Sequence, residues 1–119
     1  MEISTTSDSI DLELAVAQLG ALAQNHRLGV FRVLIQAGHN GLAAGKIAEL
    51  LDVPRSSLSF HLSNLKTAGL VCERREGRSI IYSADYAAMH SLIAYLLTNC
   101  CAAECVEPTL IEQLTTGEP

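Results

Sequence analysis

Hydrophobic residues recur every three or four positions along most of the chain, a spacing that predicts amphipathic helices. Five helices follow from this pattern and from the turn formers between the segments. They are expected at about residues 12–24, 26–36, 44–51, 55–68 and 85–101. Ser9 or Asp11 is a suitable N-cap for the first of them. In the fourth, Leu58, Leu62 and Leu65 share one face, which is expected to point toward the core.

The pattern changes from helical to alternating after the fourth helix. Residues 70–74 and 79–83 predict two strands, and Glu76-Gly77 supplies the turn between them. Pro54 separates the third helix from the fourth, because proline is tolerated at or next to a helix start but not inside a helix. Two short helices joined by a tight turn and followed by a hairpin form a winged helix-turn-helix. We therefore expect a mainly α fold with a small β-hairpin.

The chain has 119 residues, enough for one domain. We expect that domain to span residues 10–101, between a flexible arm at 1–9 and a cysteine-bearing tail at 102–119. No segment approaches about 18 uninterrupted apolar residues, which excludes a transmembrane helix, and the polar, acidic N-terminus does not resemble a secretory signal. These features favour a cytoplasmic protein whose four cysteines are thiols rather than disulfides.

The net charge of −5 argues against a nucleic-acid binder until the charges are placed along the chain. Residues 46–78 carry six basic and four acidic side chains, a local charge of 6 − 4 = +2, whereas residues 79–119 carry five acidic and no basic ones. DNA phosphates respond to this local charge rather than to the net charge. Solvated surface charges would cluster in the same way, so the charge pattern alone favours DNA binding only weakly.

The helix expected at residues 55–68 presents small hydroxyl and amide side chains outward, and such groups can approach base edges closely. The hairpin turn adds three arginines that suit phosphates or the minor groove. Phe60 points outward, which is costly unless DNA or a neighbouring segment covers the ring. His61 lies at the edge of the buried face of this helix. A structural hydrogen bond explains a histidine there at least as well as a DNA contact does. The predicted DNA contacts are Lys46, Arg55, Ser56, Ser57, Ser59, Phe60, His61, Ser63, Asn64, Arg74, Arg75 and Arg78.

Four short sequence motifs of this chain recur in a known protein family. They are Leu-Ala-x-x-x-Arg-Leu at 22–28, Ser-x-His-Leu at 59–62, Leu-x-x-Ala-Gly-Leu-Val at 65–71 and Arg-x-Gly-Arg-x-x-x-Tyr at 75–82. In these motifs the chain resembles the ArsR/SmtB metal-responsive repressors, and the resemblance extends over about residues 12–101. It implies a DNA-binding homodimer built from the first and last helices. Those two segments are among the most apolar of the chain, with more nonpolar residues than one small domain needs to bury.

Three of the four cysteines, Cys100, Cys101 and Cys105, fall within six residues. Thiolates are soft donors that suit trivalent ions such as As(III), Sb(III) and Bi(III), whereas zinc prefers a fourth ligand. Adjacent residues of a regular helix point about 100° apart, so Cys100 and Cys101 can share one ion only where the helix frays. Ligand type does not separate inorganic from methylated arsenic, Sb(III) or Bi(III), nor show whether one protomer supplies all three thiols. Cys72 lies in an apolar, alternating strand and is expected to pack rather than to bind metal.

The family resemblance narrows the choice of metal site. Some members carry a Cys-x-Cys step before the recognition helix, and the matching positions here are Ala43 and Gly45. Others bind zinc on the last helix, where Asp85 and His90 of this chain lack their partner ligands. The cluster at residues 100–105 is instead similar to that of arsenic repressors with a site at the end of the last helix.

These features predict a transcriptional repressor that leaves its operator DNA when a trivalent arsenical binds Cys100, Cys101 and Cys105. No constitutive cofactor is expected. Two alternative functions also fit the sequence. One is a thiol redox-sensing repressor of the same fold, which would use the same cysteines, and the other is a DNA-independent protein that binds soft metals. An enzyme is not expected, because the chain shows no nucleophile–base pair, phosphate loop or carboxylate pair at working spacing.

Overall fold

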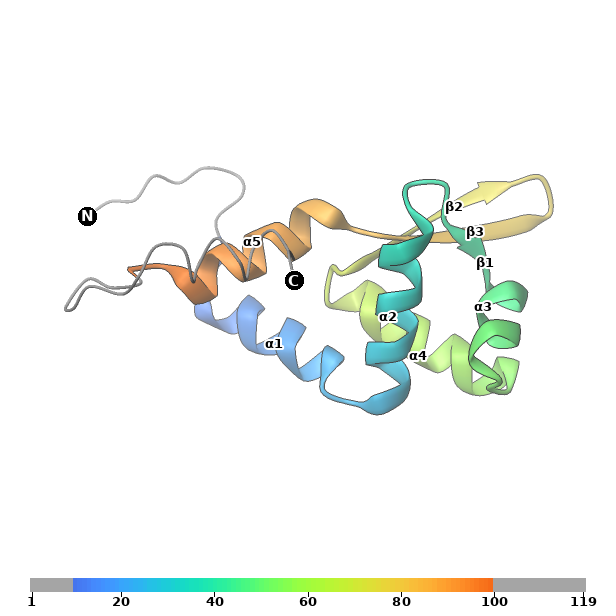
Figure 1. Cartoon of the computed structure of the whole chain (residues 1–119), viewed down its shortest axis with the longest axis horizontal. Coiled ribbons are helices and arrows are strands. Elements are labelled where there is room, and N and C mark those ends of the chain that lie inside the picture. The colour runs from blue at the N-terminus through green and yellow to red at the C-terminus, as the bar shows by residue number, and fades with distance from the viewer. Residues whose placement is uncertain (1–9, 100–119) are drawn as a thin grey trace, which may run out of the picture.

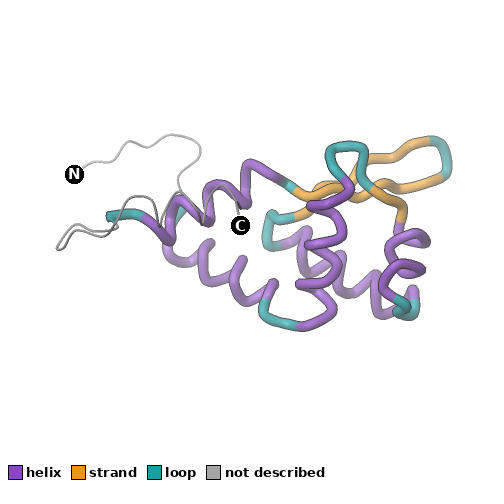
Figure 2. Tube along the Cα trace, viewed as in Figure 1, coloured by secondary structure: helices purple, strands orange, loops and turns teal. Residues whose placement is uncertain are grey.

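Five helices and a small sheet form a winged helix-turn-helix in the computed structural model, which describes residues 10–99 (Figures 1 and 2). The elements are α1 (Leu12–Leu22), α2 (Asn25–Ala37), β1 (Leu42–Ala43), α3 (Ala44–Leu51), α4 (Arg55–Thr67), β2 (Val71–Glu76), β3 (Ser79–Ala84) and α5 (Tyr86–Leu97). The expected helical fold with a small β-hairpin is thereby confirmed. The expected arm, the expected tail and the cysteines of the 100–105 cluster lie outside the described residues.

Side-chain caps determine where three of the helices begin. The carboxylate of Asp11 accepts a hydrogen bond at 2.9 Å from the backbone N–H three residues further on, so Asp11 rather than Ser9 caps α1. The Gln24 side chain caps α2 in the same way, and Asp85 accepts from the Ala88 N–H at 2.9 Å at the start of α5. Each acceptor satisfies one of the backbone N–H groups that a first helical turn leaves without a partner.

The sheet has the strand order β1-β3-β2, and both strand pairs are antiparallel. Glu76 pairs with Ser79, so the hairpin turn consists of Gly77 and Arg78, with Gly77 at φ 63°. This φ is a conformation that favours glycine, which explains the tight two-residue turn. The sequence did not predict β1, because two residues are too few to show an alternating pattern.

The hydrophobic core lies between α2, α3, α4 and the base of the sheet. On α4, Leu58, Leu62 and Leu65 are at most 2% exposed, which confirms the inward face expected from their spacing. The largest other buried side chains are Val30, Phe31, Leu34, Ile47 and Leu70. Because α4 is anchored along most of its length, its opposite face has a fixed orientation toward solvent.

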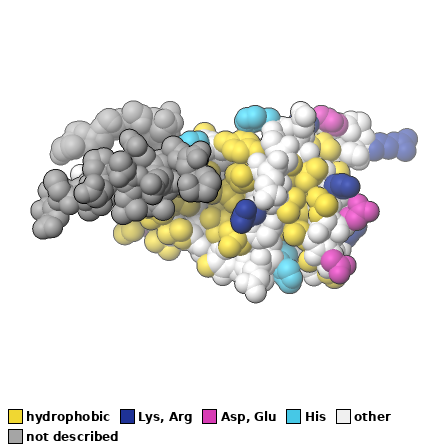
Figure 3. Space-filling view, viewed as in Figure 1, with side chains coloured by type: hydrophobic (Ala, Val, Ile, Leu, Met, Phe, Trp, Pro, Cys, Tyr) yellow, Lys and Arg dark blue, Asp and Glu magenta, His cyan; other side chains and the backbone are white. Residues whose placement is uncertain are grey.

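Helices α1 and α5 lie side by side at one end of the molecule, beside the body formed by α2, α3 and α4 (Figure 1). Their buried side chains are few: Ala15 and Gln18 on α1, and Leu92 on α5. Apolar side chains gather instead at the surface of the α1 end (Figure 3). The large exposed ones on the two helices are Leu12, Leu14, Val16, Leu19, Ile93 and Leu96. One protomer therefore leaves a broad apolar surface uncovered, although no helix within residues 10–99 is long and apolar enough to cross a bilayer.

Helix α5 is shorter than the sequence pattern indicates. It was expected to reach Cys101, but it ends at Leu97, where Thr98 takes ψ 130° and Asn99 takes φ 62°. Threonine and asparagine are weak helix formers, and asparagine tolerates the left-handed conformation that often ends a helix. The backbone of α5 therefore leaves the helical path before the position of Cys100.

Candidate nucleic-acid interface

A tight turn fixes the orientation of α4 relative to α3. Asp52 takes a left-handed conformation at φ 56°, and the N–H of Val53 donates to the Ala48 carbonyl at 3.1 Å. Pro54 follows in an extended conformation and immediately precedes α4, where its missing N–H costs nothing. The two helices thus form the helix-turn-helix expected from the sequence, with α4 in the position of the recognition helix.

The solvent face of α4 carries the small polar side chains that the sequence placed outward. Ser56, Ser57, Ser59 and Ser63 are exposed, and Phe60 is 64% exposed. This orientation follows from the burial of the leucines on the opposite side of the helix. A hydroxyl-rich helix face of this kind fits a major groove and can hydrogen-bond to base edges.

Two predicted DNA contacts, His61 and Asn64, are placed differently. His61 is only 8% exposed, with its ring 5.4 Å from that of His26. Burial, and then the proximity of Arg27 and His26, lower the pKa of His61. The expectation for His61 is therefore corrected, because a buried imidazole cannot reach base edges. Asn64 is half-buried, and its amide donates to the Phe60 carbonyl at 3.0 Å.

The first turns of α3 and α4 have no side-chain cap. Ala43 and Pro54 occupy the two N-cap positions, and neither side chain accepts a hydrogen bond from its helix. The first N–H groups of each helix are therefore available to another acceptor. The positive end of the helix dipole lies at the same place, so both helix starts suit a phosphate oxygen.

The start of α3 borders a cleft of about 340 Å³ that also reaches α4 and β3. Arg55, Ser59 and Arg78, all predicted to contact DNA, line this cleft. A Cβ at Gly45 would lie 3.6 Å from the Arg55 guanidinium, so the guanidinium lies against the first turn of α3. Tyr82 also lines the cleft, although the sequence identified it only as the last residue of the Arg-x-Gly-Arg-x-x-x-Tyr pattern. The cleft thus brings two arginines and three hydroxyl-bearing residues, Ser59, Ser79 and Tyr82, to a helix start, a combination that suits phosphate.

The predicted basic residues differ in what they already contact. Arg74 donates to the Glu76 carboxylate at 2.8 Å and to the Asn40 carbonyl at 2.9 Å, which ties the wing to the loop after α2. Lys46 lies 3.7 Å from Glu49 in an exposed pair, which contributes little to stability. Of the predicted DNA contacts, three exposed arginines form no ion pair with any residue of the described range: Arg55, Arg75 and Arg78. Their charges are available to phosphates.

Cys72 was expected to pack, and that expectation is wrong. The residue is exposed on β2, with its sulfur 3.7 Å from a carboxylate oxygen of Asp85. Local desolvation, and then the charge and hydrogen bond of Asp85, raise the pKa of the Cys72 thiol, so it is a poor ligand at neutral pH. In the part of the chain that the structure describes, no group of three or more His, Cys, Asp or Glu side chains is arranged to hold a metal.

Known proteins share much of this sequence. Residues 22–74 match the family model of a helix-turn-helix domain. The chain is 32% identical over 89 residues to the transcriptional activator HlyU of Vibrio cholerae. The matched region covers 75% of this chain and 80% of HlyU. The chain belongs to the ArsR/SmtB family of transcriptional regulators. It is also 38% identical over 77 residues to a putative arsenical resistance operon repressor, ArsR, of Halobacterium salinarum. This matched region covers 65% of this chain and 59% of that protein.

Solved structures show how far this ArsR/SmtB regulator shares its fold. Reduced HlyU from Vibrio cholerae superposes with a TM-score of 0.58 at 29% identity, over 71% of this chain and 88% of HlyU. A homodimeric winged helix-turn-helix DNA-binding domain of Mb0332 from Mycobacterium bovis, a possible ArsR-family regulator, gives a TM-score of 0.60 at 24% identity. That match covers 90% of this chain and 86% of the other. The winged helix-turn-helix is therefore shared over most of the chain.

Proposed function

We propose that this ArsR/SmtB regulator is a homodimeric repressor that binds operator DNA through α4 and the wing. The observation that carries the proposal is the cleft in which Arg55 and Arg78 lie beside the uncapped start of α3. Ser59 lines this cleft and Ser56 is exposed on the same helix, so backbone contacts and base contacts arise on adjoining surfaces. The cleft positions the helix on the phosphates, and Ser56, Ser57 and Ser59 read the groove.

The homodimer is supported by the apolar surface that one protomer leaves uncovered. Leu12, Val16 and Leu19 on α1 and Ile93 and Leu96 on α5 are each at least 41% exposed. Covering this surface with a second copy gains about 25 cal/mol per Å² removed from water. The related Mycobacterium bovis domain is described as homodimeric. A dimer presents two recognition helices about one duplex turn apart, which suits a near-palindromic operator.

The inducer that we propose is a trivalent arsenical, As(III) or the chemically similar Sb(III), bound by Cys100, Cys101 and Cys105. Three soft thiols within six residues support this choice, as does the similarity to a relative named as an arsenical resistance repressor. Helix α5 ends at Leu97, so the cluster follows directly on the helix that we assign to the dimer surface. The ion releases the operator to the extent that it binds the DNA-free dimer more tightly than the DNA-bound one.

An operator-binding titration tests both parts of the proposal. Fluorescence anisotropy measures the affinity for a duplex from the chain's own upstream region, under reductant and with increasing arsenite. A typical allosteric coupling of about 1–3 kcal/mol weakens operator binding roughly 5- to 150-fold. The variant Cys100→Ser is expected to keep DNA binding and lose the response, whereas the matched control Cys72→Ser keeps both.

The titration can contradict the proposed inducer and the proposed repressor function independently of each other. Operator affinity that does not change with arsenite overturns the inducer and leaves the repressor intact. Absence of sequence-specific duplex binding overturns the repressor, and together with arsenite binding it indicates a DNA-independent protein that binds soft metals.

A thiol redox switch is the second candidate, because a solved structure of the relative HlyU is described as its reduced form. In that case two cysteine thiols lose two electrons and two protons to hydrogen peroxide, which is reduced to water, and the resulting disulfide changes the DNA affinity. Mass spectrometry after peroxide treatment identifies such a disulfide. The arsenite stoichiometry per dimer, measured under reductant, identifies the metal site instead.

A further inference from the structure

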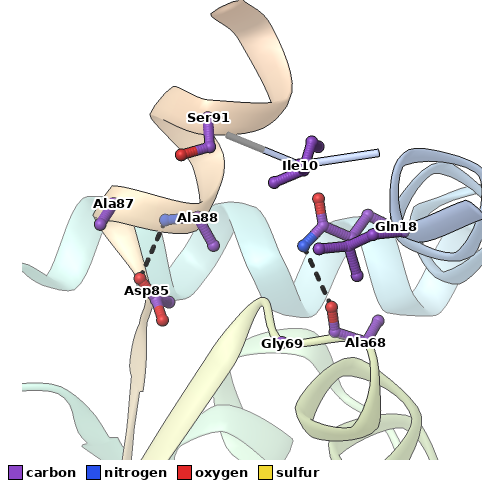
Figure 4. A pocket seen from close by; sticks show the side chains of 9 residues that line it. Ile10, Gln18, Ala68, Gly69, Asp85, Ala87, Ala88 and Ser91 are labelled. Carbon is purple, nitrogen blue, oxygen red and sulfur yellow. Dashed lines mark hydrogen bonds between the residues drawn. The ribbon is translucent and has the colours of Figure 1, made fainter. Parts of the chain in front are cut away.

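A second cavity lies away from the DNA interface, between α1, α5 and the C-terminal end of α4 (Figure 4). Its volume is about 240 Å³. The cavity is open to solvent on one side, and its volume leaves room for a small organic molecule. Gln18, Asp85 and Ser91 supply its polar groups, and Leu14 and Ala88 are among its apolar walls.

Half of the buried Gln18 amide has no partner within residues 10–99. Gln18 is 2% exposed, and its Nε2 donates to the Ala68 carbonyl at 3.1 Å, whereas its buried Oε1 accepts no hydrogen bond from the described residues. Figure 4 shows this oxygen directed away from Ala68 and toward Ile10, on the α1 side of the cavity. A buried acceptor without a donor destabilises the fold, because it has lost water and gained no partner in exchange. The cavity therefore has a defined place for a hydrogen-bond donor.

The second polar group of the cavity is the carboxylate of Asp85. One of its oxygens accepts from the Ala88 N–H, and among residues 10–99 the other accepts only from the weak thiol donor of Cys72. The residues that line the cavity include no Lys, Arg or His, so this negative charge has no basic partner there. An amide oxygen and a carboxylate both require donors, and the carboxylate favours a donor that carries positive charge.

We propose that this cavity binds a small organic cation, a protonated amine carried on a short apolar body. The ammonium group donates to Gln18 Oε1, the Asp85 carboxylate on the opposite wall attracts its charge, and the apolar body packs against Leu14 and Ala88. The proposed site uses no residue of the cysteine cluster.

The cavity and the proposed dimer surface use opposite faces of the same two helices. At 100° per residue, Leu14 and Gln18 lie about 150° around α1 from the centre of its exposed apolar stripe. On α5, the residues that line the cavity lie about 160° from the exposed Ile93 and Leu96. Covering the stripes therefore does not require contact with the helix faces that line the cavity.

Gln18 also connects the cavity to the recognition helix. Ala68 is the C-cap of α4, and its carbonyl receives the Gln18 Nε2 hydrogen bond. A donor on Oε1 polarises the amide and strengthens this bond, because linked hydrogen bonds reinforce one another. An effect of the ligand on operator affinity rests on the repressor function proposed above, whereas binding in the cavity does not.

Benzylamine, which is protonated at neutral pH, is the probe for this site, and benzyl alcohol is its neutral isostere. The experiment is an NMR titration of the ¹⁵N-labelled full chain at millimolar probe, without DNA. Benzylamine is expected to shift the Gln18 side-chain amide and the backbone amides of Ala68 and Gly69. Benzyl alcohol is expected to bind about tenfold more weakly, because hydrogen bonds to charged groups are stronger than neutral ones.

Two variants test the polar groups separately. Asp85→Asn keeps an acceptor for the α5 cap and removes the charge, so it is expected to weaken benzylamine binding about tenfold and leave benzyl alcohol unchanged. Gln18→Met keeps the side-chain volume and is expected to abolish the shift at Ala68. Asp52→Asn, on the turn before α4, is the matched control for the loss of one carboxylate. Circular dichroism confirms that each variant is folded.

Two outcomes overturn the proposal. One is the absence of shifts at these amides with benzylamine. The other is equal binding of benzylamine and benzyl alcohol by the wild type, with no difference in Asp85→Asn. Cys100→Ser is expected to bind the probe as the wild type does, so a failure of the arsenical proposal leaves this result unchanged.

Discussion

The two ends of the molecule use leucine in opposite ways. On α4, Leu58 and Leu62 are at most 2% exposed and the polar face points outward, whereas on α1 Leu12 and Leu19 are 64% and 41% exposed. Both helices carry apolar residues at helical spacing, so the difference lies in what each packs against within the protomer. A helical pattern therefore predicts a helix but does not show whether its apolar face meets the protein's own core or a second copy.

The largest effect is expected for truncation in the core beneath α4. Leu58→Ala is expected to lower the free energy of unfolding by about 2–5 kcal/mol, because it leaves a cavity at a fully buried position. Urea unfolding measures the loss. Leu12→Ala on α1 is the matched control, and its cost is expected to be smaller. Equal costs for the two substitutions, at every protein concentration, would contradict the contrast between the two ends.

A charge on the exposed stripe of α1 is expected to break the dimer without unfolding the protomer. Val16→Asp is expected to raise the dimer dissociation constant about a hundredfold, since an unpaired carboxylate buried in an interface costs several kcal/mol. Sedimentation equilibrium measures the constant, and circular dichroism confirms the helix content. Ala17→Asp places the same charge on the exposed side of α1 outside the stripe and is expected to leave the dimer intact. A dimer unaffected by Val16→Asp rules out this surface.

At the other end, removal of one free cation is expected to weaken DNA binding moderately. Arg78→Ala is expected to lower operator affinity about tenfold and to reduce the slope of log affinity against log salt by about 0.9, the value for one phosphate contact. Arg32→Ala, an exposed arginine of α2 outside the cleft, is the control. An unchanged salt slope for Arg78→Ala shows that the cleft does not meet phosphate.

The smallest effect is expected from His61, the buried histidine of α4. The pKa of His61 is lowered from the ordinary value of 6.5, so as the pH falls the unfolded chain takes up this proton before the folded one does. Its contribution to stability is complete above about pH 6.5 and is lost as the pH falls toward the folded pKa. Urea unfolding above and below that pH is expected to show a shallower pH dependence for His61→Gln than for the exposed control His90→Gln. Identical profiles would show that His61 is not the group responsible.

The sequence predicted most of the elements, because their signals are local. Pro54 marks the turn before α4, and α4 begins at Arg55 as expected. The spacing of Leu58, Leu62 and Leu65 identified the buried face, and Asp11 was one of two proposed caps for α1. Each signal depends on residues within one or two helical turns, where backbone sterics and side-chain capping decide the outcome.

What the sequence missed depends on contacts between distant segments. Cys72 lies in an alternating strand, but the hairpin extends from the body, so alternation there does not bring burial. His61 borders the stripe of α4, and only the packing of α2 against α4 decides that it is buried. The cleft joins Gly45, Arg55 and Tyr82, whose proximity no local pattern shows. The ligand role of the cysteine cluster stays a prediction.

Only one residue, Asp85, separates β3 from α5. Its N–H donates to the Leu70 carbonyl at 2.9 Å, at the base of the wing, and its carboxylate caps the helix. One inserted residue here would turn α5 by about 100° and move its apolar stripe off the shared face with α1. The chain length of this junction is therefore as restricted as the identity of a core side chain. The hairpin tip at Gly77 and Arg78, by contrast, can accept extra residues without changing the phase of any helix.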